Sequence, residues 1–345
     1  MKNTSQTIRT TRIGFWSPYL HSKRGNSTTA RRIVTGLRQT GFSVEVYAYE
    51  EDEWTPQIQT RMDSCDLFHI LHFDRFAKWM QKKNVELTKP YIVTSGGTDV
   101  NEKMENPISK DLLLNASAIT VFTDDAKDKV TGAYPQLDGR VEVVPQSFWL
   151  PEDGDFNDID LHEGYPKMLL PSGVRKVKDV LYVMDEIESL TKEYPELRFV
   201  IAGEPLEKEE VEHVKVYEDK NSWFTYVGSL PLASMTSVYK WADMVLNTSV
   251  SEGQPLSLME AMYYGKPVIA RRNGGNESLI TDGSNGFLFT DPPQFKRQLL
   301  KLMNSKELYA QMAEKGRERI ANDFSLKKEI QHYQGIYQSI RGDHL

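Results

Sequence analysis

The chain of 345 residues contains a single cysteine, Cys65. One thiol cannot form an internal disulfide or a cysteine-cluster metal site, which favours a reducing compartment. No apolar run approaches the roughly eighteen residues that a transmembrane helix needs. Residues 1–11 also lack the apolar core of a secretory signal. We therefore expect a cytoplasmic protein.

Acidic residues are absent from the first 44 positions, although the whole chain carries a formal net charge of −7 at pH 7. The same positions contain eight basic residues: Lys2, Arg9, Arg12, Lys23, Arg24, Arg31, Arg32 and Arg38. This run is either a solvated helix face that arose by chance, or a surface for an anionic acceptor or for the inner face of an anionic membrane. Nucleic acid is not an expected partner, because the rest of the chain is acidic and no recognised binding motif occurs.

The order of the predicted elements indicates an α/β protein with two domains. The length exceeds the usual size of a single core, and short apolar runs alternate with helix-period segments, which favours βαβ units and parallel sheets. We predict strands at 12–16, 44–48, 66–71, 91–95, 118–122, 141–144, 168–170, 197–202, 223–227, 244–246, 267–270 and 286–289. Two helices should face the core, one with Ala30, Ile33, Val34 and Leu37, the other with Val177, Val180, Leu181, Met184 and Ile187.

The domain boundary is expected at 151–166, a segment rich in acids with two glycines and few large apolar residues. Its acids do not fit a calcium loop, which needs glycine and glutamate where this chain has Asp158 and Gly164. We predict an N-terminal Rossmann-like domain over 1–150, a linker over 151–166, a C-terminal Rossmann-like domain over 167–325 and a final helix within 326–345.

No Gly-x-Gly-x-x-Gly follows the first predicted strand, so a nicotinamide or flavin enzyme is disfavoured. The strand leads instead into a loop where Gly25 stands beside Asn26 and other small polar residues. Glycine there allows close approach of the backbone to a ligand. The alternative is a plain helix N-cap at Asn26 or Ser27.

The most informative stretch is 251–262. Pro255 suits the first helical position and Gly265 the position just past the helix end, which predicts a short helix over 256–264. The free N–H groups at the start of this helix are suited to phosphate. Glu252 lies in the preceding loop and Glu260 on the second turn. A diphosphate flanked by two carboxylates that accept hydroxyl hydrogen bonds describes a sugar nucleotide.

This stretch resembles the Glu-x7-Glu signature of the family-four retaining glycosyltransferases, within the glycosyl transferases group 1. Blocks at 242–249, 274–277 and 282–288 follow the order of that family, and the resemblance is looser in the N-terminal half. It implies a GT-B fold, in which two Rossmann-like domains face a cleft and the last helix returns to the N-terminal domain. It also implies a retaining hexosyltransferase whose substrate is a nucleotide-sugar, with a UDP-sugar favoured and a GDP-sugar as the alternative. We expect no cofactor and no metal, because no paired acidic motif has a metal-ligand context.

The resemblance also assigns roles to individual residues. It places Glu252 at the hydroxyls of the donor sugar and Glu260 at the ribose. Lys178 and Arg175, or Lys176 in place of Arg175, would support the leaving diphosphate, where negative charge grows as the bond breaks. The other donor-binding residues that it implies are Gly253, Gln254, Pro255, Leu256, Gly173, Gly203 and Gly228. Gln254 stands where an aromatic residue is common, which leaves the donor sugar open.

Polar residues also follow two predicted strands in the N-terminal half. His69 and His72 bracket one strand end, and Gly97 and Asp99 follow the next. Many relatives have a histidine where this chain has Gly96, so His72 either takes over that role or is a packed core residue. His72, Gly97 and Asp99, with the Gly25–Asn26 loop, are the candidates for acceptor binding or for closing the site.

The sequence thus predicts a metal-independent retaining glycosyltransferase. Segments 96–101 and 173–179 are similar to a small subgroup of single-glycosyltransferase-domain proteins. Two alternatives remain: a sugar-nucleotide epimerase of the same fold, and a catalytically inactive partner subunit that binds a sugar nucleotide. The presence of Glu252, Glu260 and Lys178 argues against the inactive subunit. The sequence leaves the acceptor and the oligomeric state open.

Overall fold

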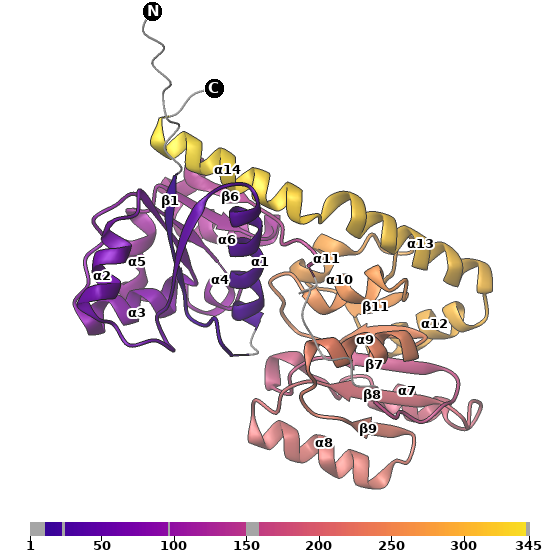
Figure 1. The fold of residues 1–345 in the computed structure, drawn as a ribbon. Coiled ribbons are helices and arrows are strands. Elements are labelled where there is room, and N and C mark those ends of the chain that lie inside the picture. The colour runs from indigo at the N-terminus through magenta and orange to yellow at the C-terminus, as the bar shows by residue number, and fades with distance from the viewer. Residues whose placement is uncertain (1–10, 23–24, 96, 150–158, 343–345) are drawn as a thin grey trace, which may run out of the picture. The chain divides into compact units, whose positions relative to one another are not determined.

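The structure is a computed structural model that describes residues 11–22, 25–95, 97–149 and 159–342. The chain divides into two compact units, one of residues 1–146 with 326–345 and the other of residues 147–325. Each unit has a parallel six-stranded sheet with an apolar cluster on either face, covered by helices (Figure 1). The prediction of an α/β protein with two parallel sheets is confirmed.

The first unit has the strand order β2-β1-β3-β4-β5-β6. Its strands are β1 (Arg12–Ser17), β2 (Ser43–Ala48), β3 (Leu67–Leu71), β4 (Tyr91–Thr94), β5 (Ala118–Val121) and β6 (Val141–Val143). Its helices are α1 (Gly25–Gln39), α2 (Pro56–Asp63), α3 (Phe73–Lys83), α4 (Thr98–Glu102), α5 (Pro107–Leu114), α6 (Asp124–Ala133), the 3-10 helix η1 (Pro135–Arg140) and α14 (Leu326–Arg341). The strand order reverses between β1 and β3, which is where open α/β sheets bind ligands.

The second unit has the order β12-β11-β10-β7-β8-β9. Its strands are β7 (Lys167–Pro171), β8 (Arg198–Ala202), β9 (Phe224–Tyr226), β10 (Met244–Asn247), β11 (Val268–Arg271) and β12 (Phe287–Phe289). Its helices are the 3-10 helix η2 (Lys176–Lys178), α7 (Met184–Leu190), α8 (Lys208–Lys220), α9 (Leu232–Trp241), α10 (Leu256–Tyr263), α11 (Gly274–Leu279), α12 (Pro292–Met303) and α13 (Lys306–Asp323). Here the order reverses between β7 and β10.

Helix α14 brings the end of the chain onto the first unit, where it packs beside α1 (Figure 1). Its apolar residues Ile330, Tyr333, Ile336 and Tyr337 are buried in the same cluster as those of α1. Arg32 of α1 donates to both carboxylate oxygens of Glu329 on α14, at 2.8 and 3.0 Å, and both side chains are 1% exposed. A buried ion pair therefore joins the two helices.

The helix predicted to carry Val177 through Ile187 begins only at Met184. Residues 176–178 form η2, and Asp179 then adopts a left-handed conformation with φ 45°. An α-helix of L-residues does not continue through that conformation. Val180, Met184 and Ile187 are still buried, so the apolar spacing identified core positions but not the turn between them.

Two helix starts also differ from the prediction. Helix α1 already includes Gly25, so Asn26 and Ser27 lie inside it and neither is its N-cap. Helix α10 has Pro255 as its N-cap residue, where the sequence suggested the first helical position. The shifts are of one to three residues, because local sequence fixes helix ends only approximately.

The described part of the predicted linker packs against the second unit. Ile159 and Leu161 contact the apolar cluster there, and the indole N–H of Trp241 donates to the carbonyl of His162 at 3.2 Å. Residues 150–158 lie outside the described residues.

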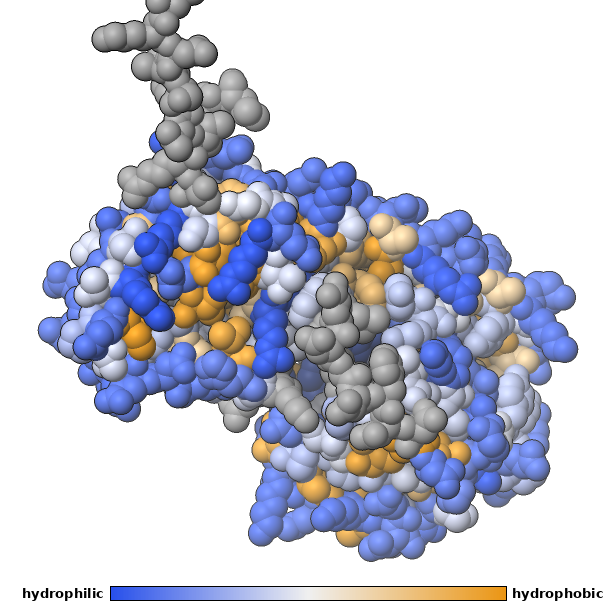
Figure 2. Space-filling view, viewed as in Figure 1, coloured by the Kyte–Doolittle hydropathy of each residue, from blue (hydrophilic) through white to orange (hydrophobic). Residues whose placement is uncertain are grey.

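Polar residues cover most of the face shown in Figure 2. The large apolar side chains that are exposed lie on separate elements: Ile108, Tyr165, Leu206, Val216, Val250 and Tyr263. None of the helices within the described ranges is long and apolar enough to cross a bilayer.

Half of the basic N-terminal run lies in the described residues. Arg12 is paired with Glu45 at 2.7 Å and Arg32 with Glu329, while Arg31 and Arg38 donate to backbone carbonyls at the surface. The others, Lys2, Arg9, Lys23 and Arg24, lie outside those residues. Arg32 is buried and is therefore not part of a charged surface.

Candidate functional site

The switch point of the second unit brings together the loops that carry the predicted donor-binding residues. Strands β7 and β10 are parallel neighbours. The loop after β7 leads to Lys178, and the loop after β10 contains Glu252. Because the carboxyl ends of parallel strands meet at one edge of the sheet, these two residues from distant parts of the chain become adjacent.

Lys178 and Glu252 form the centre of this site. The Nζ atom of Lys178 lies 2.6 Å from Glu252 Oε1, and both side chains are largely buried. Asn247 Nδ2 and Ser249 Oγ also donate to Oε1, at 3.1 and 2.7 Å. No side chain or amide of the described residues donates to Oε2, which leaves that oxygen for a ligand.

The ionised form of Glu252 is stabilised by these contacts. Burial alone would raise the pKa of Glu252, but Lys178 and the hydrogen bonds from Ser249 and Asn247 outweigh it and lower the pKa below its ordinary value. The carboxylate is therefore charged at neutral pH, and it can accept hydrogen bonds from sugar hydroxyls.

Lys178 is positioned by the segment around it. The Thr248 hydroxyl donates to the carbonyl of Lys178 at 3.0 Å. The next residue, Asp179, accepts from Arg271 Nη1 at 2.8 Å, and the Arg271 guanidinium lies 3.8 Å from the ring centroid of Tyr182. These contacts join the loop after β7 to the ends of β10 and β11.

Arg175 and Lys176 differ in their surroundings. Arg175 is partly buried, and its Nε has no hydrogen-bond partner among the described residues, whereas Lys176 is exposed. A buried N–H without a partner costs free energy unless a ligand accepts from it. The two candidates therefore differ in that Arg175 has a buried donor that a ligand could satisfy.

Glu260 lies on α10 and is held by a residue of α9. Tyr239 donates its hydroxyl to Glu260 Oε2 at 2.6 Å. Burial raises the pKa of Glu260 to about 7, although the hydrogen bond from Tyr239 opposes the shift. The other oxygen, Oε1, receives no hydrogen bond from the described residues.

The predicted glycines of the second unit lie at the ends of β7, β8 and β9. A Cβ on Gly203 would lie 1.9 Å from the Ser172 carbonyl oxygen, and one on Gly173 would lie 2.7 Å from Leu206 Cδ1. Gly228 has φ +70°, which glycine adopts without strain, and its carbonyl accepts from the Gly203 N–H at 2.8 Å. These three glycines thus allow the loops to approach one another closely.

The loop before α10 packs against the start of α11. A Cβ on Gly275 would lie 2.6 Å from Glu252 Cβ, so only glycine fits beside this glutamate. Gln254 and Pro255 are buried, while Gly253 and Leu256 are partly exposed. Gln254 Nε2 donates to Ser278 Oγ at 3.4 Å. Gln254 therefore supports the loop from inside.

The candidates of the first unit also gather at a switch point. His72 follows β3, and Gly97 and Asp99 follow β4, which is the neighbour of β3. His72 has φ 73°, an uncommon conformation for a residue with a side chain. Its buried Nδ1 has no hydrogen-bond partner among the described residues and lies 3.6 Å from Asp99 Oδ2.

Asp99 is fully buried and accepts four hydrogen bonds within the protein. Ser95 Oγ and the N–H groups of Gly97 and Val100 donate to Oδ1 at 2.8–3.1 Å, and the N–H of Phe73 donates to Oδ2 at 3.2 Å. Asp99 therefore holds the ends of β3 and β4 together and has no exposed surface for an acceptor.

The remaining candidates of this unit lie in different environments, one in the core and the others at the start of α1. His69 is a core residue, bonded to Tyr337 and Thr94 at 2.6 Å each, and burial lowers its pKa to about 3. Gly25 and Asn26 form the first turn of α1, after β1, and a Cβ on Gly25 would meet nothing within 4 Å. Gly96 lies outside the described residues.

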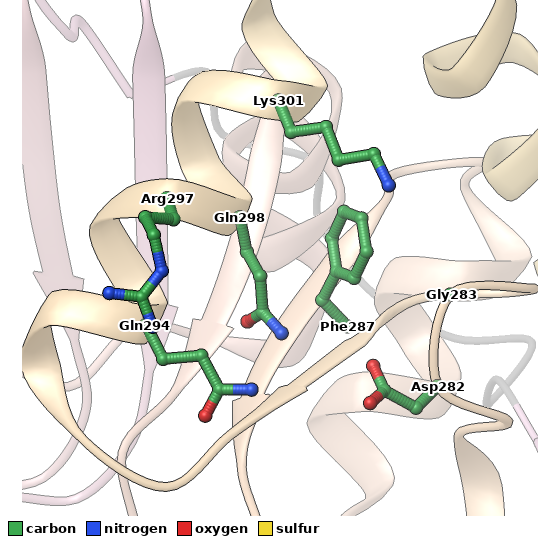
Figure 3. Close-up of a pocket in the computed structure, with 7 residues that line it drawn as sticks. All are labelled: Asp282, Gly283, Phe287, Gln294, Arg297, Gln298 and Lys301. Atoms are coloured by element: carbon green, nitrogen blue, oxygen red, sulfur yellow. The ribbon is translucent and has the colours of Figure 1, made fainter.

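A cavity of about 350 Å³ lies elsewhere in the second unit, at the free edge of β12 (Figure 3). Asp282 accepts from the Leu288 N–H at 2.9 Å, and Gln298 donates to the Leu288 carbonyl at 2.9 Å. These side chains satisfy the outward-facing backbone of the edge strand, which protects it from pairing with another chain. We therefore assign them a structural role.

Sequence reasoning did not single out several residues that build the site. Asn247 and Ser249 form a polar run directly after an apolar strand, which is a signal that the sequence did contain. Tyr239, Asp179 and Arg271 have no such signal, because each reaches the site only through contacts between distant segments.

Comparison with known proteins agrees with this geometry. Residues 152–319 match the family model described as glycosyl transferases group 1. Glycosyltransferase 1 domain-containing protein 1 of Xenopus tropicalis is 24% identical over 341 residues, which cover 93% of this chain and 96% of that protein. The structure of Anabaena HepE in complex with UDP-glucose matches with a TM-score of 0.73 and 16% identity, over 95% of this chain and 99% of HepE. Sucrose-phosphate synthase of Thermosynechococcus elongatus matches with a TM-score of 0.73 and 14% identity, over 97% of this chain and 100% of that one.

The second half of the chain therefore matches the group 1 glycosyltransferases, and the two sheets are those of the GT-B fold. The fold that the Glu-x7-Glu resemblance implied is confirmed, and the family model agrees with the family that it implied.

Proposed function

We propose that this protein is a metal-independent, retaining glycosyltransferase that transfers a sugar from a nucleotide-sugar to an acceptor. A UDP-sugar is the favoured donor and a GDP-sugar the alternative. The match of residues 152–319 to the group 1 glycosyltransferases supports transfer from a nucleotide-sugar, and the fold neighbour HepE was solved with UDP-glucose. The identity of the acceptor is open.

The observation that carries this proposal is the contact between Lys178 and Glu252 at the β7–β10 switch point. A site for a sugar diphosphate needs hydrogen-bond acceptors for the sugar and positive charge for the leaving group. The free Oε2 of Glu252 provides the first, and Lys178 with Arg175 provides the second. A cation beside the leaving diphosphate stabilises the charge that develops there in the transition state.

We assign the rest of the donor to the neighbouring loops. Glu260 accepts from the ribose hydroxyls through its free Oε1. The backbone of Gly253, Gln254, Pro255 and Leu256 meets the sugar and the phosphates, because the start of α10 presents unpaired N–H groups. Gly173, Gly203 and Gly228 border the phosphates and the base.

For the acceptor we propose the switch point of the first unit. His72 faces the acceptor or the donor sugar, Asp99 positions His72, and Gly97 with the Gly25–Asn26 turn forms the closing loop. Positioning is the role that fits Asp99, since its four internal hydrogen bonds leave it no exposed surface.

Donor binding tests the proposal first. UDP-glucose, UDP-N-acetylglucosamine and GDP-mannose are compared by thermal shift, where a ligand at 100 times its dissociation constant adds about 2.7 kcal/mol of stability. We expect one donor to raise the melting temperature, also after treatment with EDTA. A donor effect that EDTA abolishes and magnesium or manganese restores would show that a metal supports the diphosphate.

Product analysis then separates transfer from its alternatives. With the bound donor alone, an epimerase gives a new nucleotide-sugar, whereas a transferase gives at most slow hydrolysis. With an acceptor panel, we expect a glycoside whose anomeric configuration equals that of the donor. An inverted product would refute retention, and binding without any turnover would favour the inactive subunit.

A further inference from the structure

The hydroxyl of Tyr239 lies between two acceptors inside the second unit. Its oxygen is 2.6 Å from Glu260 Oε2 and 3.1 Å from the carbonyl oxygen of Ser257. The Tyr239 side chain is 1% exposed, so water does not replace either contact. Because a phenol has one hydrogen, it can make a full hydrogen bond to only one of these two oxygens at a time.

This geometry suits two protonation states of Glu260. When Glu260 is a carboxylate, Tyr239 donates to it. When Glu260 is a carboxylic acid, its own O–H donates to the Tyr239 oxygen, and Tyr239 then donates to Ser257. The second arrangement is a complete chain of two hydrogen bonds, and both distances fit it.

The charged groups around α10 do not favour the carboxylate. Helix α10 packs against β10, β11 and α13. Four basic groups on these elements and the adjoining loops pair with other acids: Lys178 with Glu252, Arg271 with Asp179, Arg317 with Glu314 and Arg319 with Asp323. Two others, Lys266 and Lys315, donate to the carbonyl of Lys240 and to Ser284 Oγ. Tyr264, the other titratable neighbour, stacks on Tyr239 and bonds to Thr236. Glu260 is thus a half-buried carboxyl beside a hydroxyl, and no cation of the described residues forms an ion pair with it.

We propose that Glu260, which Tyr239 positions for the nucleotide, carries a proton in the ligand-free protein, and that donor binding releases this proton. The inference rests on the proposed function, in which Glu260 meets the ribose. Two ribose hydroxyls that donate to a carboxylate favour its charged form, because hydrogen bonds to an ionised acceptor are the stronger ones. The proton leaves Glu260 for the solvent, and no other bond changes. The pKa of Glu260, raised to about 7 by burial, places the release near neutral pH.

The test measures binding of UDP-glucose by calorimetry between about pH 6 and pH 8.5. This donor is chosen because its diphosphate is esterified at both ends and does not titrate in that range. Below the pKa we expect affinity to rise about tenfold per pH unit, and above it to level off, as linkage to one proton requires. Titrations in two buffers of different ionisation enthalpy should show nearly one proton released at pH 6 and nearly none at pH 8.5.

Three variants identify the group. Tyr239→Phe removes the donor to the carboxylate, so the pH profile should move to higher pH, with a larger loss of affinity at pH 6.5 than at pH 8.5. Tyr264→Phe is the matched control, since its hydroxyl bonds to Thr236, and the profile should stay in place. Glu260→Gln should bind weakly at every pH, with no proton released.

The outcomes separate this inference from the proposed function. Affinity that is independent of pH in the wild type, with an unchanged profile in Tyr239→Phe, overturns the inference and leaves the function standing. If UDP-glucose, UDP-N-acetylglucosamine and GDP-mannose all fail to bind at every pH, the proposed function fails. The proton is then read directly from the carboxylic-acid band in infrared difference spectra of the wild type against Glu260→Gln. A band lost with a midpoint near neutral pH supports the Tyr239–Glu260 proton, and its absence at pH 6 overturns it.

Discussion

Arg271 Nη1 lies 2.8 Å from Asp179 Oδ2, and this ion pair fixes the residue that directly follows Lys178. Asp179 has φ 45°, a left-handed conformation that costs L-residues about 1–2 kcal/mol. The pair with Arg271 offsets this cost and holds the turn. Lys178 therefore reaches Glu252 because a residue on another strand stabilises the bend beside it.

Substitutions of Asp179 distinguish the effect of the left-handed turn on kcat from the effect of the ion pair with Arg271. Asp179→Gly adopts the left-handed conformation without strain but loses the ion pair with Arg271. Asp179→Ala loses the ion pair and keeps the strain, and Asp179→Asn tolerates the conformation and can still accept from Arg271. We expect kcat to fall in the order Asn, Gly, Ala, with Ala lowest. Steady-state kinetics checks this order, and equal kcat in all three would show that the turn does not position Lys178.

Lys178→Ala should lower kcat by roughly 10²–10³, since the charge that Lys178 meets develops in the transition state. KM for the donor should change much less. Lys176→Ala is the matched control, because this lysine is two residues away and exposed, and it should keep near wild-type kinetics. If KM rises as much as kcat falls, Lys178 contributes to ground-state binding and not to the chemical step.

Loss of Lys178 should also change the pH dependence of activity. Lys178 is the strongest of the contacts that lower the pKa of Glu252 against the effect of burial. Without it the pKa rises, so a higher pH is needed to keep Glu252 ionised. The acid limb of the kcat profile should therefore move to higher pH in Lys178→Ala, and an unmoved limb would indicate that Glu252 does not need its charge.

The buried pair of Arg32 and Glu329 gives a stability prediction. Arg32→Met removes the cation beside the buried carboxylate of Glu329 and should lower the free energy of unfolding by about 3–5 kcal/mol. Arg12→Met breaks the more exposed pair with Glu45 and should cost at most ~1 kcal/mol. Urea unfolding followed by tryptophan fluorescence measures both, since Trp16, Trp54 and Trp79 lie in this unit. Similar losses would mean that the α1–α14 contact does not depend on the ion pair.

The hydrogen bonds to Glu51 lead to a prediction of how the stability of the protein changes at low pH. Burial alone would raise its pKa, but the N–H groups of His21, Leu20 and Ser22 donate to it and lower the pKa to about 2. Because the pKa of Glu51 is lowered in the folded protein, its carboxylate stabilises the fold at pH values above its ordinary pKa of 4.5. This contribution is lost as the pH falls from 4.5 toward 2. Glu51→Gln should thus destabilise the protein at pH 7, with the difference from the wild type shrinking below pH 4.5. The neighbouring exposed Glu50→Gln is the control, and a difference that stays constant with pH would contradict the assignment.

The basic N-terminal run is tested with vesicles that contain anionic lipid. If the basic run is a membrane-binding surface, binding of the protein to the vesicles should fall steeply as the salt concentration rises, because exposed charges are screened over about 8 Å at physiological ionic strength. Replacing Lys23 and Arg24 by Gln should weaken it. The same change at Lys82 and Lys83, two exposed lysines at the end of α3, should not. Equal binding by both double variants would leave the run as a solvated face.

Much of the fold could be predicted from the sequence. All twelve predicted strands are present, with ends shifted by at most one residue, because apolar runs between turn residues are a local signal. The helix after Glu252 is also local, since Pro255 and Gly265 mark its two ends. The Glu-x7-Glu spacing indicated the family whose model matches residues 152–319 for the same reason: its residues lie in one short segment.

Only the tertiary structure decided how the individual side chains are used. Tyr239 is 21 residues from Glu260 in sequence, and Arg271 is 92 residues from Asp179, so no local pattern connects either pair. Arg175 is partly buried and Lys176 is exposed, although the sequence does not distinguish them. Asp99 is fully buried and bonds to the ends of β3 and β4, although it also looks like an exposed polar residue in the sequence. Periodicity and turn chemistry act over a few residues and set the elements. The site is made by loops that meet only when β7, β10 and β11 are in register, which depends on the packing of the whole sheet.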